Sequence, residues 1–135
     1  MRANGTFSVK AFNPASVTPE PAITTGLPVS VATLEKQFEG DIAGRSATVF
    51  TAAFDQATGV GTYVAMESFE GSVGGRQGAF NFVHSASTTG ADRSGGYFAI
   101  VPSSGTGELA GISGTGDLVV DADGTHRIWL EYALG

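Results

Sequence analysis

The run 62–71, TYVAMESFEG, places a carboxylate in line with aromatic side chains. Side chains alternate across a strand, so Tyr63, Glu67 and Phe69 share one face if the run is extended. A carboxylate in an apolar interior has a raised pKa and can act as an acid or a base near neutral pH. We therefore take Glu67 as the first catalytic candidate. The alternatives are a structural carboxylate bonded to Tyr63 or His84, or a half-exposed strand residue.

The run 77–87, QGAFNFVHSAS, carries the second catalytic candidate, His84. By the same alternation, His84 shares a face with Phe80 and Phe82, and an inward-facing histidine can orient or exchange a proton with a nearby carboxylate. The alternative is an interior histidine whose ring nitrogens are satisfied by hydrogen bonds of purely structural value.

The last apolar run, THRIWLEYAL over 125–134, places Tyr132 on the same face as Ile128 and Leu130. If the aromatic faces of the strands point inward, these polar-tipped and aromatic side chains line the interior. We expect four residues to contact a ligand there: Tyr63, Phe80, Phe82 and Tyr132.

The glycine-rich stretch VPSSGTGELAGISGTG, 101–116, invites comparison with a nucleotide-binding loop. A dinucleotide fingerprint needs G-x-G-x-x-G at the start of a helix, but here the third glycine, Gly111, comes one residue late. The glycines that follow would weaken a helix, and no lysine is present for a phosphate-binding loop. We interpret the stretch as a connection between strands and expect no cofactor.

Other catalytic and metal-binding patterns are missing as well. The chain has no cysteine, and its two histidines, His84 and His126, are far from the spacing of a metal-binding pair. No serine lies in a G-x-S-x-G elbow. We expect no bound metal.

The elements that must position these residues read as strands separated by turns every eight to twelve residues, a spacing typical of an antiparallel sandwich or barrel. The expected strands are 5–12, 29–40, 45–55, 62–71, 77–87, 97–104, 112–121 and 125–134. The proline-rich segment 13–28 reads as irregular. We predict an all-β fold in which residues 1–135 form a single domain of about eight antiparallel strands, arranged as a sandwich or a barrel.

Composition limits the partners. The net charge is −6 and the few basic residues are scattered, so binding to nucleic acid or to an anionic membrane surface is not expected. No apolar run reaches the length of a membrane-spanning helix, of about 18 residues, and the first residues lack a signal-peptide core. We expect a soluble, cytoplasmic protein. Sparse charge and apolar residues on both strand faces, such as Val64 and Met66 opposite Glu67, also predict a homo-oligomer.

Four segments, in their order and spacing, resemble a family of small bacterial single-domain proteins of unknown function: GDIAG, YVAMESFEGSVGGRQGAFNFVH, VPSSGTGELAGISG and DGTHRIWLEY. That family is similar in fold to allene oxide cyclase and dirigent proteins. The resemblance implies that residues 1–135 form a single antiparallel β-barrel of about eight strands with an interior cavity. It implies no catalytic residues, because none are established for the family.

Three functions follow from these observations. The first is a cyclase or isomerase that holds an apolar substrate in a reactive conformer and uses one acid/base group. The second is a non-catalytic carrier of a hydrophobic ligand. The third is a filled barrel that acts as an assembly module. Binding of an apolar small molecule is favoured over the filled barrel, and whether the protein is an enzyme is left open.

Overall fold

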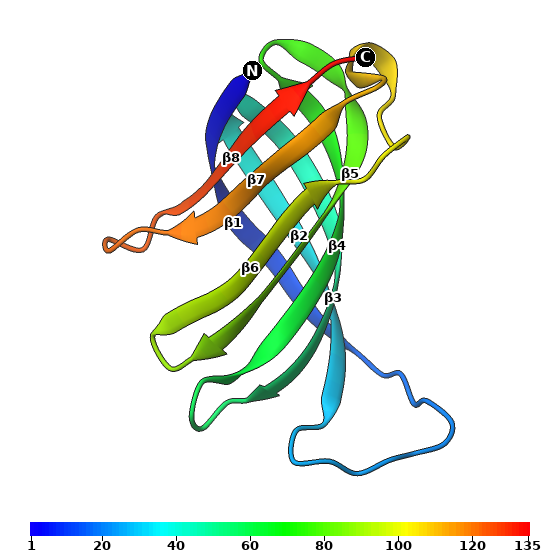
Figure 1. Cartoon of the computed structure of the whole chain (residues 1–135), viewed down its shortest axis with the longest axis vertical. Helices are drawn as coiled ribbons and strands as arrows, with labels where there is room; N and C mark the ends of the chain where they lie inside the picture. The colour runs from blue at the N-terminus through cyan, green and yellow to red at the C-terminus, as the bar shows by residue number, and fades with distance from the viewer.

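The computed structural model describes residues 1–135 as eight strands and one short 3₁₀ helix (Figure 1). The elements are β1 (Arg2–Ala15), β2 (Val29–Gly40), β3 (Ile42–Asp55), β4 (Val60–Val73), β5 (Arg76–Thr89), β6 (Asp92–Ile100), η1 (Gly107–Leu109), β7 (Ser113–Val120) and β8 (His126–Ala133). The all-β prediction is confirmed. No helix of the structure could cross a membrane.

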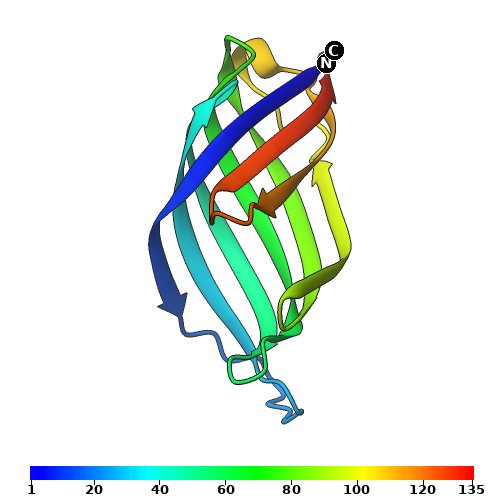
Figure 2. The same ribbon diagram turned by 90° about the vertical axis from the view of Figure 1, so that its left-hand side faces the viewer.

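The strands form one antiparallel sheet in the order β6-β5-β4-β3-β2-β1-β8-β7. The sheet curls until its edge strands β6 and β7 face each other, which makes a nearly closed barrel (Figures 1 and 2). Side chains bridge these two edges: Thr115 Oγ1 donates to the Phe98 carbonyl at 2.9 Å, and Arg93 Nη1 donates to the Leu118 carbonyl at 2.6 Å.

The two ends of the barrel differ. The upper end in Figure 1 holds both chain termini and η1, and the lower end holds the irregular segment 16–28. Strands β7 and β8 have eight residues each, against twelve to fourteen in β1 to β5. As a result β1 pairs with β8 only over Arg2–Phe7, and its remaining residues have a strand neighbour on one side alone.

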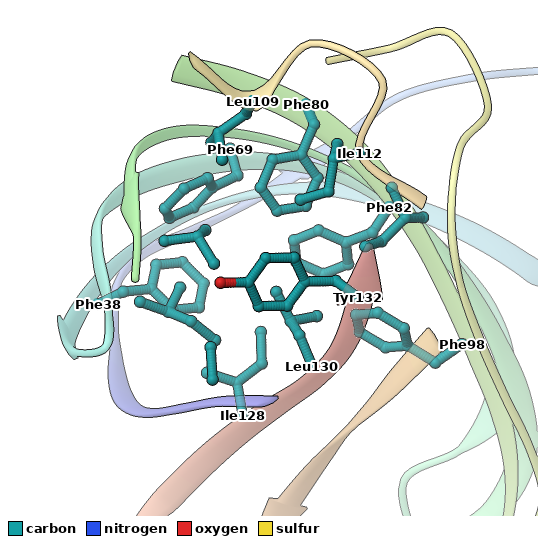
Figure 3. Close-up of a cluster of buried hydrophobic side chains, with 14 of the residues drawn as sticks. Phe38, Phe69, Phe80, Phe82, Phe98, Leu109, Ile112, Ile128, Leu130 and Tyr132 are labelled. Carbon is teal, nitrogen blue, oxygen red and sulfur yellow. The ribbon is translucent and has the colours of Figure 1, made fainter. Parts of the chain in front are cut away.

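Hydrophobic side chains fill the upper half of the barrel (Figure 3). Phe82 stacks on Phe98 with ring centroids 4.9 Å apart, and Phe69 packs edge-on against Phe38 at 5.5 Å. The labelled members of this cluster are Phe38, Phe69, Phe80, Phe82, Phe98, Leu109, Ile112, Ile128, Leu130 and Tyr132. The members of this cluster that lie on strands point inward as strand alternation predicts.

The glycine-rich stretch closes the upper end of the barrel. Its residues bond to the edge of β5, with the Thr106 amide donating to the Ala79 carbonyl at 2.8 Å, and it inserts a fully buried Leu109 into the core. A β-carbon at Gly78 would lie 2.1 Å from the Thr106 carbonyl oxygen, so glycine permits this close approach. The interpretation of this stretch as a connection between strands is confirmed, with the addition of η1.

Two irregularities shift the strand faces. A bulge near Lys10 lets β1 place both Phe7, opposite Phe38, and Phe12, opposite Leu34, on the inward face. A second one in β6 offsets its pairing with β5 and turns Arg93 inward, opposite Thr88. The strand expected over 97–104 is β6, which covers Asp92–Ile100, so the expected bounds are wrong at both ends.

Candidate functional site

Glu67 lies at the centre of the barrel and is completely buried. Lys36 Nζ of β2 donates to its Oε1 at 2.9 Å, and Ser46 Oγ of β3 donates to its Oε2 at 2.5 Å. His84 Nε2 of β5 lies 3.2 Å from Oε1. Three neighbouring strands therefore satisfy one carboxylate, as a charge taken out of water requires.

The surroundings keep Glu67 ionised. Burial alone raises the pKa of this carboxyl, but the hydrogen bond from His84, the charge of Lys36 and the hydrogen bonds from Ser46 and Lys36 together lower that pKa from 4.5 to about 2. The raised pKa expected from the sequence is therefore wrong, because strand alternation does not show which side chains of other strands contact Glu67. Glu67 acts as a fixed negative charge at neutral pH, and it cannot serve there as a proton donor.

The hydrogen bonds continue from Glu67 toward the edge of the sheet. His84 Nδ1 lies 3.3 Å from Tyr63 Oη, and Arg93 Nη2 donates to the same hydroxyl at 3.0 Å. With its proton on Nε2, the His84 ring donates to Glu67 and accepts from Tyr63, a tautomer assigned from the network. Burial raises the pKa of Tyr63, partly offset by the charge of Arg93, so its hydroxyl stays protonated.

One hydroxyl in the interior has no hydrogen-bond partner. Thr48 pairs with Glu67 across β3 and β4, is 2% exposed, and its Oγ1 bonds to no other group. An unsatisfied buried hydroxyl costs free energy. Thr48 therefore marks a position where a further polar atom would be favourable.

A cavity of about 300 Å³ opens below this cluster, at the lower end of the barrel. Its wall contains Phe12, Phe50, Ala52, Phe54, Tyr63 and Thr88. Tyr63 belongs both to this wall and to the hydrogen-bonded chain, so the chain reaches the cavity there. The Phe50 ring stacks on Tyr63 with ring centroids 5.3 Å apart. Phe12 and Phe54 are 55% and 43% exposed although their strands turn them inward, which leaves large apolar surface facing the opening.

The structure links three of the residues chosen from the sequence by hydrogen bonds and leaves the other three outside this chain, although the Phe82 ring packs beside His84 with centroids 6.0 Å apart. Glu67, His84 and Tyr63 form one hydrogen-bonded chain. The expected ligand contacts Phe80, Phe82 and Tyr132 belong instead to the packed upper core and are absent from the wall of the cavity. The reason is that the inward faces of long strands such as β4 and β5 run past both the filled half and the open half of the barrel, whereas the short β8 places Tyr132 in the upper half alone.

Lys36 and Arg93 were missed by the sequence reading. Lys36 alternates with Leu34 and Phe38 in a run of twelve residues, so the same parity rule would have turned it inward. For Arg93 no such signal exists, because the irregularity in β6 breaks the alternation between Phe98 and Arg93. No group of three or more His, Cys, Asp or Glu side chains is placed to hold a metal ion.

Comparisons with known proteins identify relatives without an assigned activity. The family model described as "Protein of unknown function (DUF3224)" matches residues 3–132. A solved structure of a protein of unknown function from the same family, from Shewanella oneidensis MR-1, superposes with a TM-score of 0.84. The two share 29% sequence identity over 100% of this chain and 98% of the other. No curated protein matches the sequence.

Proposed function

The chain belongs to the DUF3224 family of proteins of unknown function, and we propose from its interior that it binds a small, mostly apolar molecule. The observation that carries this proposal is the pairing of a cavity of about 300 Å³ with a buried polar chain that reaches its wall at Tyr63. Ligand sites in proteins are typically apolar pockets of this kind with a few fixed polar groups.

Two further observations support binding over a filled barrel. Small side chains, Ala52, Ala65 and Ala86, occupy inward positions around the polar chain, whereas phenylalanines fill the upper half. Exposed Phe12 and Phe54 at the opening would gain from contact with an apolar occupant. A barrel filled with side chains, the third function considered above, fits only the upper half of this molecule.

The test uses a neutral, apolar fluorescent probe, N-phenyl-1-naphthylamine, titrated into the purified protein. We expect saturable binding that Ala52→Leu weakens by about ten-fold or more, because added carbons in the cavity wall take the place of the ligand. Ala47→Leu, on the exposed outer face of the same strand, is the matched control and should leave the affinity unchanged. Equal binding by the two variants would contradict the proposal.

A cyclase or isomerase activity, as the resemblance to allene oxide cyclase suggested, is the second candidate. The chain Glu67–His84–Tyr63 favours it. A proton from a bound ligand would pass to Tyr63 Oη while the Tyr63 proton passes to His84 Nδ1. The ionised Glu67 would then stabilise the imidazolium, as a carboxylate does in a catalytic triad.

This candidate is tested by following deuterium exchange at the α-carbon of a small ketone, 2-octanone, in D₂O by NMR. The protein should accelerate the exchange, and Tyr63→Phe should abolish the acceleration while still binding the fluorescent probe. Exchange at the background rate with the unmodified protein would rule out this form of catalysis and leave the carrier function.

A further inference from the structure

Arg93 differs in its partners from the three arginines of the chain that form ion pairs. Arg2, Arg45 and Arg127 each contact a carboxylate, on Glu131, Glu70 and Asp121 respectively. Arg93 instead donates to two uncharged oxygens, the Leu118 carbonyl at 2.6 Å and Tyr63 Oη at 3.0 Å. Its positive charge is therefore held in place by hydrogen bonds without being matched by a carboxylate.

The position of Arg93 relates it to the cavity. Its pairing partner on β5 is Thr88, which lines the cavity, and its hydrogen-bond partner Tyr63 lines the cavity as well. A guanidinium has five N–H groups, and these two bonds use two of them. The remaining three stay available in a fork whose orientation β4 and β7 have already set.

Of the other charged groups near Tyr63, Lys36 has a carboxylate partner, and Asp117 forms no ion pair with Arg93. Lys36 is matched by Glu67 within the barrel. Asp117, whose charge acts on Tyr63, accepts a hydrogen bond from the Leu118 amide at 2.8 Å. The arrangement thus leaves the solvent-exposed guanidinium of Arg93 next to two residues of the cavity wall, Tyr63 and Thr88.

We infer that the occupant of the cavity is a small apolar carboxylate, with its carboxylate on the free N–H groups of Arg93 and its hydrocarbon against Phe12, Phe50 and Phe54. This inference rests on the proposed binding function and adds the chemical class of the ligand. A single guanidinium matches the two oxygens of a carboxylate in charge and in geometry. A phosphate dianion would leave a second charge unmatched beside apolar walls.

The inference is tested with two probes of the same chain length, octanoate and octan-1-ol, titrated calorimetrically into the whole protein at neutral pH. Octanoate should bind about ten-fold tighter or more, as a hydrogen bond to a charged group provides. Arg93→Met keeps the apolar stem and removes the charge, so it should abolish this preference and retain octanol binding. Arg76→Met removes an exposed arginine at the upper end of the barrel and should change neither affinity.

The outcomes separate this inference from the proposed function. The carboxylate assignment would be overturned if the unmodified protein bound both probes equally well, or if the preference for octanoate survived in Arg93→Met. In either case, binding of octan-1-ol would still support the proposed binding function of the cavity. Binding of the fluorescent probe without either octyl compound would also overturn it. Failure of all three probes would overturn the binding function itself.

Discussion

Lys36 and Glu67 form a buried ion pair, so removing either charge leaves the other buried without a counter-charge. Their side chains are 5% and 0% exposed. Glu67→Gln would leave the ammonium without a counter-charge, and we expect it to lower the free energy of unfolding by about 3–5 kcal/mol, measured by urea denaturation. The double variant Lys36→Met/Glu67→Gln should recover most of this loss.

The matched control is Glu70→Gln, which removes an exposed carboxylate on the same strand that pairs with Arg45. Its cost should stay below about 1 kcal/mol, as for surface ion pairs. A Glu67→Gln variant as stable as Glu70→Gln would show that the buried pair contributes little.

The low pKa of Glu67 also predicts an acid-sensitive fold. Because this pKa is about 2 in the folded protein against an ordinary 4.5, the pair stabilises the fold fully above about pH 4.5. That contribution is lost as the pH falls toward about 2, where the folded-state carboxylate takes up its proton. Urea denaturation across this range should show a steeper fall for the unmodified protein than for Glu67→Gln. Parallel curves would contradict the assignment of the low pKa.

For Thr48 we expect a substitution to stabilise the protein. Because its buried hydroxyl has no partner, Thr48→Val should raise the free energy of unfolding by about 1 kcal/mol. Thr33→Val, at an exposed position of β2, serves as control and should stay within about 0.5 kcal/mol. A destabilised Thr48→Val would mean that the hydroxyl is satisfied in solution by a bound polar atom.

At the scale of elements, the closure of the upper end depends on close backbone approach between β5 and the glycine-rich stretch. In Gly78→Ala the added carbon would lie 2.1 Å from the Thr106 carbonyl oxygen. We expect a loss of stability of about 1–3 kcal/mol and faster hydrogen exchange of the Thr106 amide, which bonds to Ala79. Gly26→Ala, where an added carbon meets nothing within 4 Å, is the control. An unchanged exchange rate of the Thr106 amide in Gly78→Ala would show that the glycine-rich stretch accommodates the added methyl group without separating from β5.

At the scale of the whole molecule, apolar side chains also gather on the outer face of the barrel. Val49 pairs with Met66 across β3 and β4, and Met66 pairs with Val83 of β5. Val49, Val64 and Met66 are each about half exposed. We propose that a second copy of the chain covers this surface, as the expected homo-oligomer requires.

Light scattering at micromolar concentration should therefore give a mass above that of one chain. Met66→Glu should reduce it to the monomer, because a buried carboxylate without a partner opposes association. Ser68→Glu, on the same face of the same strand, is the control. A monomeric mass for the unmodified protein would contradict the proposal that a second copy covers this surface.

Much of the fold could be predicted because alternation and turn spacing are local properties of the chain. The period-two runs predicted the strands and the inward direction of Tyr63, Glu67 and His84, which follow from backbone geometry alone. The turn spacing predicted about eight antiparallel strands, and the family resemblance predicted that they form a barrel. The sequence by itself therefore determined which faces are buried in the regular strands β3, β4 and β5.

Only the tertiary structure decided what each inward side chain meets. Lys36 and Glu67 are 31 residues apart, and their contact depends on the register of three strands. Arg93 turns inward through an irregularity in β6, and the unequal strand lengths divide the interior into a filled half and an open half. The pKa of Glu67 and the place of the cavity follow from these long-range contacts, because charge and space inside a barrel depend on every strand around it.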